Sequence, residues 1–355
     1  MDETMNSQNL LRKAIKHKYN DMFDNGRLSE KFTDDDLEQV IDLASSDFLS
    51  SIDFFFIGDY LSKFELENQN EFRNKNEEIW GELFRLLNSY VSFSIWTNQI
   101  NQKYFTKNPI FSDHELINVL FSLHARTCLI SKEILVLLKS GYPDAAISRW
   151  RTLNEFCTTL YFIISNGNEC AKRFLDHSLI DRYNSQKILK AQKDKYPKKL
   201  NHIEFDIDNY HDLCKEVDKL KKVYGSIFTS DYGWIDGFVQ KAKKYGYRTI
   251  ERAVELDHLQ PFSKLANHYV HSSSESMFYS LSSENGEDIN FEGSYKGLAF
   301  PLDCTLVSMN VVNNKVLSYL AESDNELKSN NTLAVLILDF YFHEIRFKLS
   351  KLISS

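Results

Sequence analysis

Apolar residues recur along most of the chain at the three- and four-residue intervals that place them on one face of an α-helix. Leu37, Val40 and Ile41 have this spacing near the N-terminus, and Trp80 and Leu83 begin a longer run of it. The pattern predicts a succession of helices. From residue 79 onward the predicted helices span 79–100, 112–139, 143–165, 169–190, 207–224, 249–257, 262–270, 303–322 and 327–352.

Turn-forming residues are scarce and fall between these helices. The chain has 12 Gly and 5 Pro in 355 residues, well below the usual shares of about 7% and 5%, which favours long helices. Ser112 and Glu115 form a capping-box pattern at a helix start. Gly141 suits the left-handed position after a helix and Pro143 suits the first turn of the next one. The short turn between them predicts a helical hairpin.

Three segments interrupt the helical pattern. Residues 52–57 look strand-like in isolation, but their flanks favour a buried helix; residues 68–75 are polar and are predicted to be a connector. The pattern lapses again at 101–111. We therefore predict an all-α fold, a multi-helix bundle in which residues 1–108 form an N-terminal helical extension and residues 109–355 form the central helical bundle.

The helix predicted at 143–165 carries the most informative charges. Its apolar residues lie on nearly all sides, which is typical of a central helix. Arg151, Asn154, Glu155 and Thr158 form one polar strip along it, and Arg149 lies on the opposite flank. Because unpaired buried charge is costly, two interpretations stay open. Arg151 and Glu155 form an ion pair that fixes the helix register, or the arginines bind an anion or phosphate in a polar site with Asn154.

Composition limits the partners. The formal net charge is −8 and the sequence pI is about 5.7, so no overall positive field attracts nucleic acid. A local basic patch could still bind RNA. The strongest candidate is the lysine-rich segment 187–199, whose alternative interpretation is a solvated helix end and loop. A homodimer is also considered.

Cysteine usage and hydropathy indicate a soluble, cytoplasmic protein. The five cysteines lie far apart with no C-x-x-C pair, which suits reduced, buried thiols. Residues 1–9 are polar and acidic, without the apolar core of a signal peptide. The longest apolar runs, 52–57 and 333–338, fall far short of the roughly 18 residues that a membrane span needs. No membrane association is expected.

Familiar catalytic and cofactor motifs are absent. The sequence has no Gly-rich phosphate loop, no paired C-x-x-C zinc site and no nucleophile elbow, and we expect no cofactor and no metal. His343 and Glu344 begin like a zincin motif, but Phe347 stands where the second His is required. His268 and His271 are three residues apart and could share a helix face. We interpret them as hydrogen-bonding histidines of a polar site more readily than as metal ligands.

One stretch resembles a bacterial helical family known only as a domain of unknown function. The residues that match the family pattern are Gly141-Tyr142 with Ala145 and Ala146, then Arg149, Arg151, Leu153 and Glu155. An isolated Trp follows in the family, for which Trp234 is the candidate. The last element would be 264–272, where Val270, His271 and Ser273 match and Ala266 replaces the expected Ser. The resemblance covers residues 113–280 and implies a site of Arg151, Glu155 and His271.

Helical proteins of this kind are similar to HEPN bundles, some of which are ribonucleases or toxins that use an Arg and a His four to six residues apart. Arg12 to His17 and Arg252 to His258 have that spacing, but it arises easily by chance. The leading hypothesis from this fold-level analogy is a HEPN-like endoribonuclease or toxin, for example in phage defence. Its catalytic residues would be Arg151, Glu155 and His271, and Arg149, Asn154 and His268 would bind. The alternative is a non-catalytic helical sensor or scaffold with a buried polar cluster.

Overall fold

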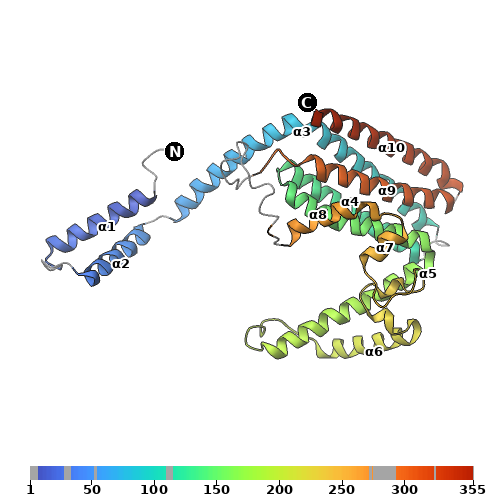
Figure 1. Ribbon diagram of the computed structural model, residues 1–355, viewed down its shortest axis with the longest axis horizontal. Coiled ribbons are helices and arrows are strands. Elements are labelled where there is room, and N and C mark those ends of the chain that lie inside the picture. The colour runs from blue at the N-terminus through green and yellow to red at the C-terminus, as the bar shows by residue number, and fades with distance from the viewer. Residues whose placement is uncertain are drawn as a thin grey trace. The chain divides into compact units, whose positions relative to one another are not determined.

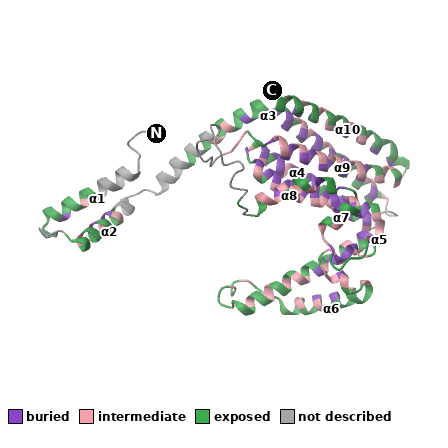
Figure 2. Ribbon diagram, in the orientation of Figure 1, coloured by how far each residue is buried: buried purple, intermediate pink, exposed green. Residues whose placement is uncertain are grey.

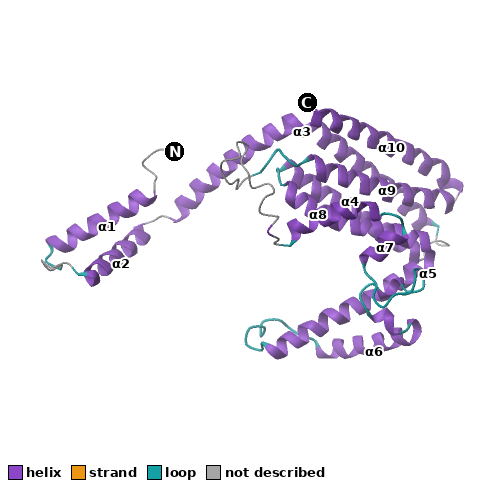
Figure 3. Ribbon diagram, viewed as in Figure 1, coloured by secondary structure: helices purple, strands orange, loops and turns teal. Residues whose placement is uncertain are grey.

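The computed structural model describes residues 7–27, 33–51, 54–108, 115–271, 274, 293–323 and 325–354. Within these ranges the chain forms α-helices, short 3-10 helices and no β-strand (Figures 1 and 3), which confirms the predicted all-α fold. The α-helices are α1 (Ser7–Asp24), α2 (Asp34–Ser51), α3 (Phe54–Lys107), α4 (Glu115–Lys139), α5 (Pro143–Lys195), α6 (Ile207–Tyr224), α7 (Tyr247–Ala253), α8 (Gln260–Val270), α9 (Ala299–Ser323) and α10 (Asn325–Ser354).

The chain forms two compact units, Met1–Phe72 and Arg73–Ser355. In the first, α1 packs against α2 around Met22 and Val40, a small core. The second holds the large core. A division at residue 108 stays a prediction, although apolar residues of α3 between Trp80 and Phe105 belong to the core of the second unit.

The core of the second unit is built around α4, α5 and α9. The helix α4 packs along α5, and α9 packs against α4, α5 and α10. Buried residues are concentrated where these helices meet (Figure 2). Trp150 and Phe162 of α5 are almost wholly buried. The helix predicted to be central is therefore central, because its apolar residues face several neighbours at once.

The turn between α4 and α5 has the predicted geometry. Gly141 has φ of 76°, and its amide donates to the Leu138 carbonyl at 3.1 Å. Pro143 begins α5. The side chain of Asn76 in α3 adds a cap that the sequence did not predict, donating to the last carbonyls of α4, those of Leu138 (3.0 Å) and Lys139 (2.9 Å). Carbonyls that would be left open at a helix end are thus satisfied.

A kink divides α5 where Asn166-Gly167 was predicted to end the helix. Gly167 has φ of 77° and ψ of −163°, which is not helical, and helical backbone resumes on both sides. Asn168 beside the kink accepts a hydrogen bond from the Leu116 amide at 3.0 Å and donates to Glu115 at 2.7 Å, so it caps α4. The capping box predicted from Ser112 lies outside the described residues.

The connector predicted at residues 68–75 is wrong, because α3 runs through it without a break. The segment contains no Gly or Pro, and polar residues such as Gln, Glu, Arg and Lys are good helix formers. Polarity alone therefore did not end the helix. Of the strand-like segment at 52–57, Phe54 to Ile57 are helical as predicted, and the first two residues lie outside the described part.

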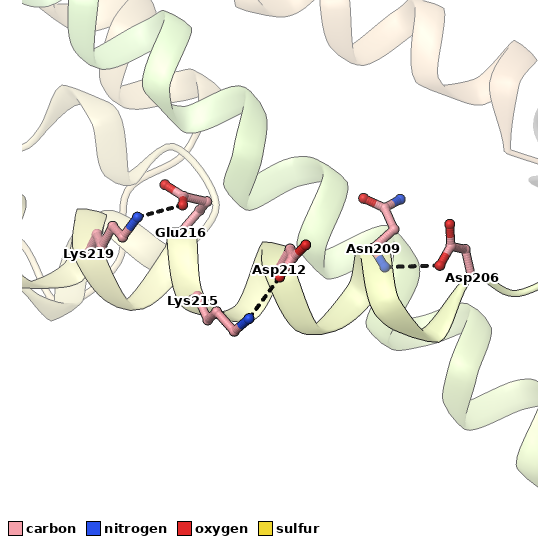
Figure 4. Close-up of polar contacts among 6 residues, drawn as sticks. All are labelled: Asp206, Asn209, Asp212, Lys215, Glu216 and Lys219. Carbon is pink, nitrogen blue, oxygen red and sulfur yellow. Dashed lines mark hydrogen bonds and ion pairs between the residues drawn. The ribbon is translucent and has the colours of Figure 1, made fainter.

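The second half of α5 pairs with α6, and Tyr183 stacks on Tyr210 between them with ring centroids 5.9 Å apart. Asp206 caps α6 by accepting from the Asn209 amide at 2.9 Å (Figure 4). Lysines of the basic segment 187–199 lie over tyrosine rings, with Lys190 5.2 Å from the Tyr210 ring. These contacts support the interpretation of this segment as a helix end and loop.

One polar network is enclosed between α3, α4 and α9. His124 Nε2 lies 2.7 Å from Asn313 Oδ1, and the Asn313 amide nitrogen donates to Tyr90 Oη at 3.1 Å and to Ser94 Oγ at 2.9 Å. All four side chains are buried. We call these residues the enclosed network.

All five cysteines carry free thiols, and four of them are buried. Burial raises the pKa of the Cys128 and Cys170 thiols to about 12, so they stay protonated. Among the described helices, none combines the length and apolar character required to cross a membrane.

Candidate functional site

The polar strip of α5 is only partly buried at Arg151 and Glu155. Their side chains are 32% and 34% exposed and form an ion pair of 3.3 Å between Arg151 Nη2 and Glu155 Oε1. Burial raises the pKa of the Glu155 carboxyl, and Arg151 opposes this rise. Arg149, on the other flank as predicted, pairs with Glu133 of α4. Each of the two arginines thus has its own carboxylate partner.

Asn154 is buried and belongs to a chain of hydrogen bonds that joins α5, α7 and α9. Its amide nitrogen donates to Tyr247 Oη at 3.0 Å, and Tyr247 donates onward to Thr158 at 3.0 Å. Its amide oxygen accepts from Ser308 at 3.2 Å, and Ser308 accepts from the Trp150 indole at 2.9 Å. These bonds hold α7 against α5 and so position the side chains around Arg151.

A cavity of about 530 Å³ opens beside this chain, between α5, α7 and α8. Both α7 and α8 pack on α5 (Figure 1). We call it the basic cavity. It is lined by Arg151, Lys244, Tyr245, Gly246, Tyr247, Arg248, Thr249, Glu251, Gln260, Ser263, Lys264 and Asn267.

The charges of the basic cavity are mostly positive. Arg151, Lys244, Arg248 and Lys264 supply four cations, against the single carboxylate of Glu251. A chain with a net charge of −8 thus gathers cations from three separate segments at one concave surface. Such a concentration of guanidinium and ammonium groups is the chemistry that binds phosphates and carboxylates.

Three buried polar atoms of the basic cavity, Glu251 Oε1, Gln260 Nε2 and Asn267 Oδ1, have no partner in good hydrogen-bond geometry among the described residues. Tyr247 and Gln260 nevertheless lie near the Glu251 carboxyl and lower its pKa against the effect of burial. Glu251 is only 1% exposed, and burial raises the pKa of its carboxyl above the ordinary value. Because buried polar groups are nearly always satisfied in proteins, unmatched donors and acceptors at one cavity indicate a ligand that completes them.

The predicted histidines lie outside the basic cavity. His271 follows the last residue of α8, is exposed, and its amide donates to the Asn267 carbonyl at 2.9 Å. His268 is half-buried and does not line the cavity. Arg252 and His258 are exposed. Of the site predicted from Arg151, Glu155 and His271, the structure shows the contact between Arg151 and Glu155, and the participation of His271 stays a prediction.

The described residues contain no group of three His, Cys, Asp or Glu side chains placed to hold a metal ion. What the basic cavity offers is hydrogen bonding and positive charge.

Comparison with known proteins finds one family model that matches this region. Residues 117–288 match the model of a family of unknown function, DUF5677. No curated protein and no solved structure matches the chain. The predicted resemblance to a domain of unknown function, placed at residues 113–280, is confirmed. The step from that family to HEPN bundles is not tested by these comparisons.

The DUF5677 segment includes most of α4 and all of α5, α6, α7 and α8. Every residue that lines the basic cavity therefore belongs to it. Helices α9 and α10 lie outside the segment, although Ser308 of α9 supports Asn154. The family region alone thus carries the cavity, and the C-terminal helices complete its support.

Sequence reasoning missed Lys244, Arg248, Glu251 and Lys264 in the DUF5677 segment. The signal available was weak: a Lys241-Ala242-Lys243-Lys244 run, then Tyr245-Gly246-Tyr247 before a short helix. Basic runs are common on protein surfaces. Lys244 is exposed, like Lys241 and Lys243, and it differs from them in lining the cavity that the packing of α7 and α8 against α5 creates.

Proposed function

We propose that this protein binds a small phosphate-bearing ligand of the nucleotide type in the basic cavity and acts as a non-catalytic sensor of it. One observation carries the proposal: four cationic side chains and three unmatched buried polar atoms meet at one cavity. The volume of about 530 Å³ lies within the range of pockets for small molecules and cofactors.

The phosphate is bound by the guanidinium and ammonium groups. Arg151 and Arg248 can each present two N–H groups to one phosphate, and Lys264 adds a point charge. Arg151 is partly held by Glu155, so its orientation is set before the ligand arrives. Such preorganisation reduces the entropy lost on binding.

The rest of the ligand carries hydrogen-bond donors. Asn267 Oδ1 only accepts hydrogen bonds, and Glu251 Oε1 does the same when Glu251 is ionised. A fully ionised phosphate group supplies no donor to either. A ribose hydroxyl or an exocyclic amino group would satisfy both kinds of acceptor. A nucleotide joins these groups to phosphate in one molecule, whereas inorganic phosphate does not.

Calorimetric titration with AMP, ATP and inorganic phosphate tests this proposal on the full chain. The double variant Arg248→Ala/Lys264→Ala is expected to bind the nucleotide at least tenfold more weakly. The matched control Lys243→Ala/Arg252→Ala removes the same charge from exposed positions that do not line the cavity. Equal affinity in both variants, or no binding of any nucleotide, would refute the proposal.

A HEPN-like endoribonuclease is the second candidate. The observation that favours it is the position of His271, four residues beyond the cavity residue Asn267 and exposed at the end of α8. An RNA strand with one phosphate in the cavity could extend past this imidazole. Arg151 would then stabilise charge on the reacting phosphate and Glu155 would act as the base. Arg149, Asn154 and His268 would support that site from the surrounding helices.

Incubation of the purified protein with total RNA distinguishes the two candidates. Cleavage that is lost in His271→Ala but kept in His258→Ala supports the ribonuclease, and toxicity in a bacterial host that Arg151→Ala relieves would extend it to a defence role. Equal cleavage by all three proteins would assign the activity to a contaminant. Absence of cleavage by the natural protein would refute the ribonuclease candidate.

A homodimer is proposed on separate grounds. The helix α10 exposes a row of apolar side chains, Leu333, Leu336, Phe340 and Phe347, each more than half exposed. A second copy of α10 could cover them. Light scattering at micromolar concentration is expected to give twice the 41.5 kDa chain mass, and Phe340→Glu is expected to return it to one.

A further inference from the structure

A second cavity, of about 370 Å³, lies along α5 next to the ion pair of Arg151 and Glu155. We call it the aromatic cavity. Its rings come from Phe156 and Phe174 of α5 and from Tyr232 and Trp234, which stand at a short 3-10 helix. Its chemistry differs from that of the basic cavity, and the proposed nucleotide does not use it.

The rings of the aromatic cavity are held in place by packing. Phe174 meets Trp234 edge to face with centroids 5.1 Å apart, and Trp234 is only 4% exposed. Tyr232 adopts a left-handed backbone with φ of 58°, uncommon for a residue with a side chain. Strained backbone of this kind persists where the surrounding structure enforces it. The ring walls are therefore preformed.

All formal charges that line the aromatic cavity are negative. Glu155, Asp181 and Asp231 contribute three carboxylates, and no Lys or Arg is among the described residues that line it. Three cations stand at its border: Arg151 bonded to Glu155, Arg126, which lies 6.0 Å from the Phe156 ring centroid, and Arg173, which donates to the Trp234 carbonyl. The charged groups of the lining itself suit a positive ligand.

The remaining polar groups do not change that sign. His177 lines the cavity with Nε2 3.0 Å from the Ser230 carbonyl and Nδ1 3.4 Å from Asp181 Oδ1. Burial raises the pKa of the Tyr232 hydroxyl, and the carboxylates of Glu155, Asp231 and Asp181 raise it further against the effect of Arg151.

We propose that the aromatic cavity binds a primary alkylammonium group. The faces of aromatic rings attract an ammonium ion, and carboxylates accept its N–H groups, while the rings also receive its methylene stem. A metal ion is disfavoured because the described side chains hold no group of three ligands suited to one. Donors on the nitrogen make a primary amine a better match than a quaternary ammonium, which has none.

The same segment of the protein already contains an aromatic cage filled by its own cation. The Arg173 guanidinium carbon lies 4.7 Å from the Tyr224 ring centroid and 5.4 Å from that of Phe228, and Arg173 Nε donates to the Trp234 carbonyl at 3.0 Å. The aromatic cavity likewise has ring walls, with acidic groups in its lining in place of an internal cation.

Calorimetric titration of the full chain with n-butylammonium tests the site. Asp181→Asn/Asp231→Asn is expected to weaken binding at least tenfold, and the control Asp208→Asn/Asp218→Asn removes the same charge from exposed positions of α6. The side chain of Asp231 makes none of the hydrogen bonds described for the fold, and Asp231→Asn alone is expected to weaken binding of n-butylammonium at least threefold. Equal affinity of the test and control pairs, or 1-butanol binding as tightly as n-butylammonium, would overturn the proposal.

The source of the amine is a separate arm of the same experiment. Spermidine represents a free polyamine, and the peptide Gly-Lys-Gly represents a lysine side chain of another protein. Tetramethylammonium, which keeps the charge and lacks N–H groups, is expected to bind at least fivefold more weakly than n-butylammonium. Tighter binding of tetramethylammonium would replace the primary amine by a quaternary one and so refute the stated class.

A coupling between the cavities follows, and this step rests on the proposed nucleotide site. Arg151 lines the basic cavity, Glu155 lines the aromatic cavity, and the two are bonded to each other. A phosphate that draws Arg151 away leaves Glu155 free to accept the ammonium group. Each ligand is then expected to strengthen binding of the other by the same factor.

Saturating nucleotide is expected to increase the affinity for n-butylammonium two- to fivefold, the range that an ion pair of this exposure can contribute. Glu155→Gln is expected to abolish the increase. Amine binding without any effect of nucleotide refutes the coupling and leaves the amine site standing. Amine binding in a protein that binds no nucleotide refutes the proposed function alone.

Discussion

The enclosed network and the basic cavity both place polar side chains among packed helices, yet they differ in what is left unmatched. In the enclosed network Asn313 bonds to His124, Tyr90 and Ser94, and one atom of these side chains, His124 Nδ1, has no described partner. In the basic cavity Glu251 and Asn267 keep acceptor atoms without a described partner, and both residues line an open volume. Buried polar side chains by themselves therefore do not indicate a functional site. Buried polar atoms that lack a hydrogen-bond partner and lie beside a cavity do indicate one.

The two regions also differ in the direction of their electrostatic response. Burial lowers the pKa of His124, so the enclosed network favours a neutral imidazole. Burial raises the pKa of Glu251, so the cavity favours a neutral carboxyl. A decrease in pH is thus expected to lower the stability contributed by His124 and to raise the stability contributed by Glu251. Substitutions in the two regions are expected to have different effects as well.

The largest expected effect is the loss of Asn313 from the enclosed network. Asn313→Ala leaves the buried His124 without its partner and removes bonds to Tyr90 and Ser94, which is expected to lower the free energy of unfolding by roughly 2–4 kcal/mol. Chemical denaturation measures it. The cavity variant Arg248→Ala/Lys264→Ala, tested beside it, should change stability by less than about 0.5 kcal/mol. Comparable losses in both would remove the distinction between the regions.

His124→Gln is expected to change how stability depends on pH. Because the folded pKa of His124 lies below its ordinary value of 6.5, the unfolded chain binds more protons below that value, and stability falls as pH decreases through the window beneath it. Glutamine can keep a hydrogen bond to Asn313 and does not titrate. The difference in melting temperature between the variant and the natural protein should therefore grow in favour of the variant from pH 7 to pH 5.

Local signals in the sequence predicted much of the fold. Gly141 and Pro143 defined the α4–α5 turn because a left-handed residue and a helix-starting residue act within a few positions. The connector predicted at 68–75 failed because a polar segment without Gly or Pro can continue a helix. At that point the helix propensity of the residues decided, and their polarity did not.

The site was predicted only where it lies on α5. Arg151 was recognisable because its helix is apolar on nearly all sides, so a charge there stands out. Arg248 and Lys264 come from α7 and α8, roughly one hundred residues later, and nothing in their neighbourhood distinguishes them from surface residues. The sequence contains these charges but not the packing that brings them together.

Glu251→Gln is expected to give the opposite pH response to His124→Gln. The folded pKa of Glu251 lies above the ordinary value of 4.5, so between the two the folded protein holds a proton that the unfolded chain has released. Stability contributed by this group is full below pH 4.5 and is lost as pH rises through the folded pKa. Glutamine removes that loss.

Thermal melts of both proteins from pH 4 to pH 8 measure the effect. The melting temperature of Glu251→Gln relative to the natural protein should rise with pH and then level off above the folded pKa. Glu204→Gln, a change at an exposed carboxyl, is the control and should show no such trend. A flat difference for both variants would mean that Glu251 titrates as a solvated carboxyl, and the contrast with His124 would disappear.

The smallest expected effect on stability is that of Glu155→Gln, and it separates the two interpretations of the α5 charges. Both partners of the Arg151 ion pair are about one-third exposed, and such pairs contribute at most about 1 kcal/mol. If the pair existed to fix the helix register, its removal would cost more than this and Arg151→Met would cost the same. If the pair serves the cavities, both variants remain folded within about 1 kcal/mol. Arg151→Met then weakens nucleotide binding, while Glu155→Gln leaves the phosphate its guanidinium and weakens only the amine.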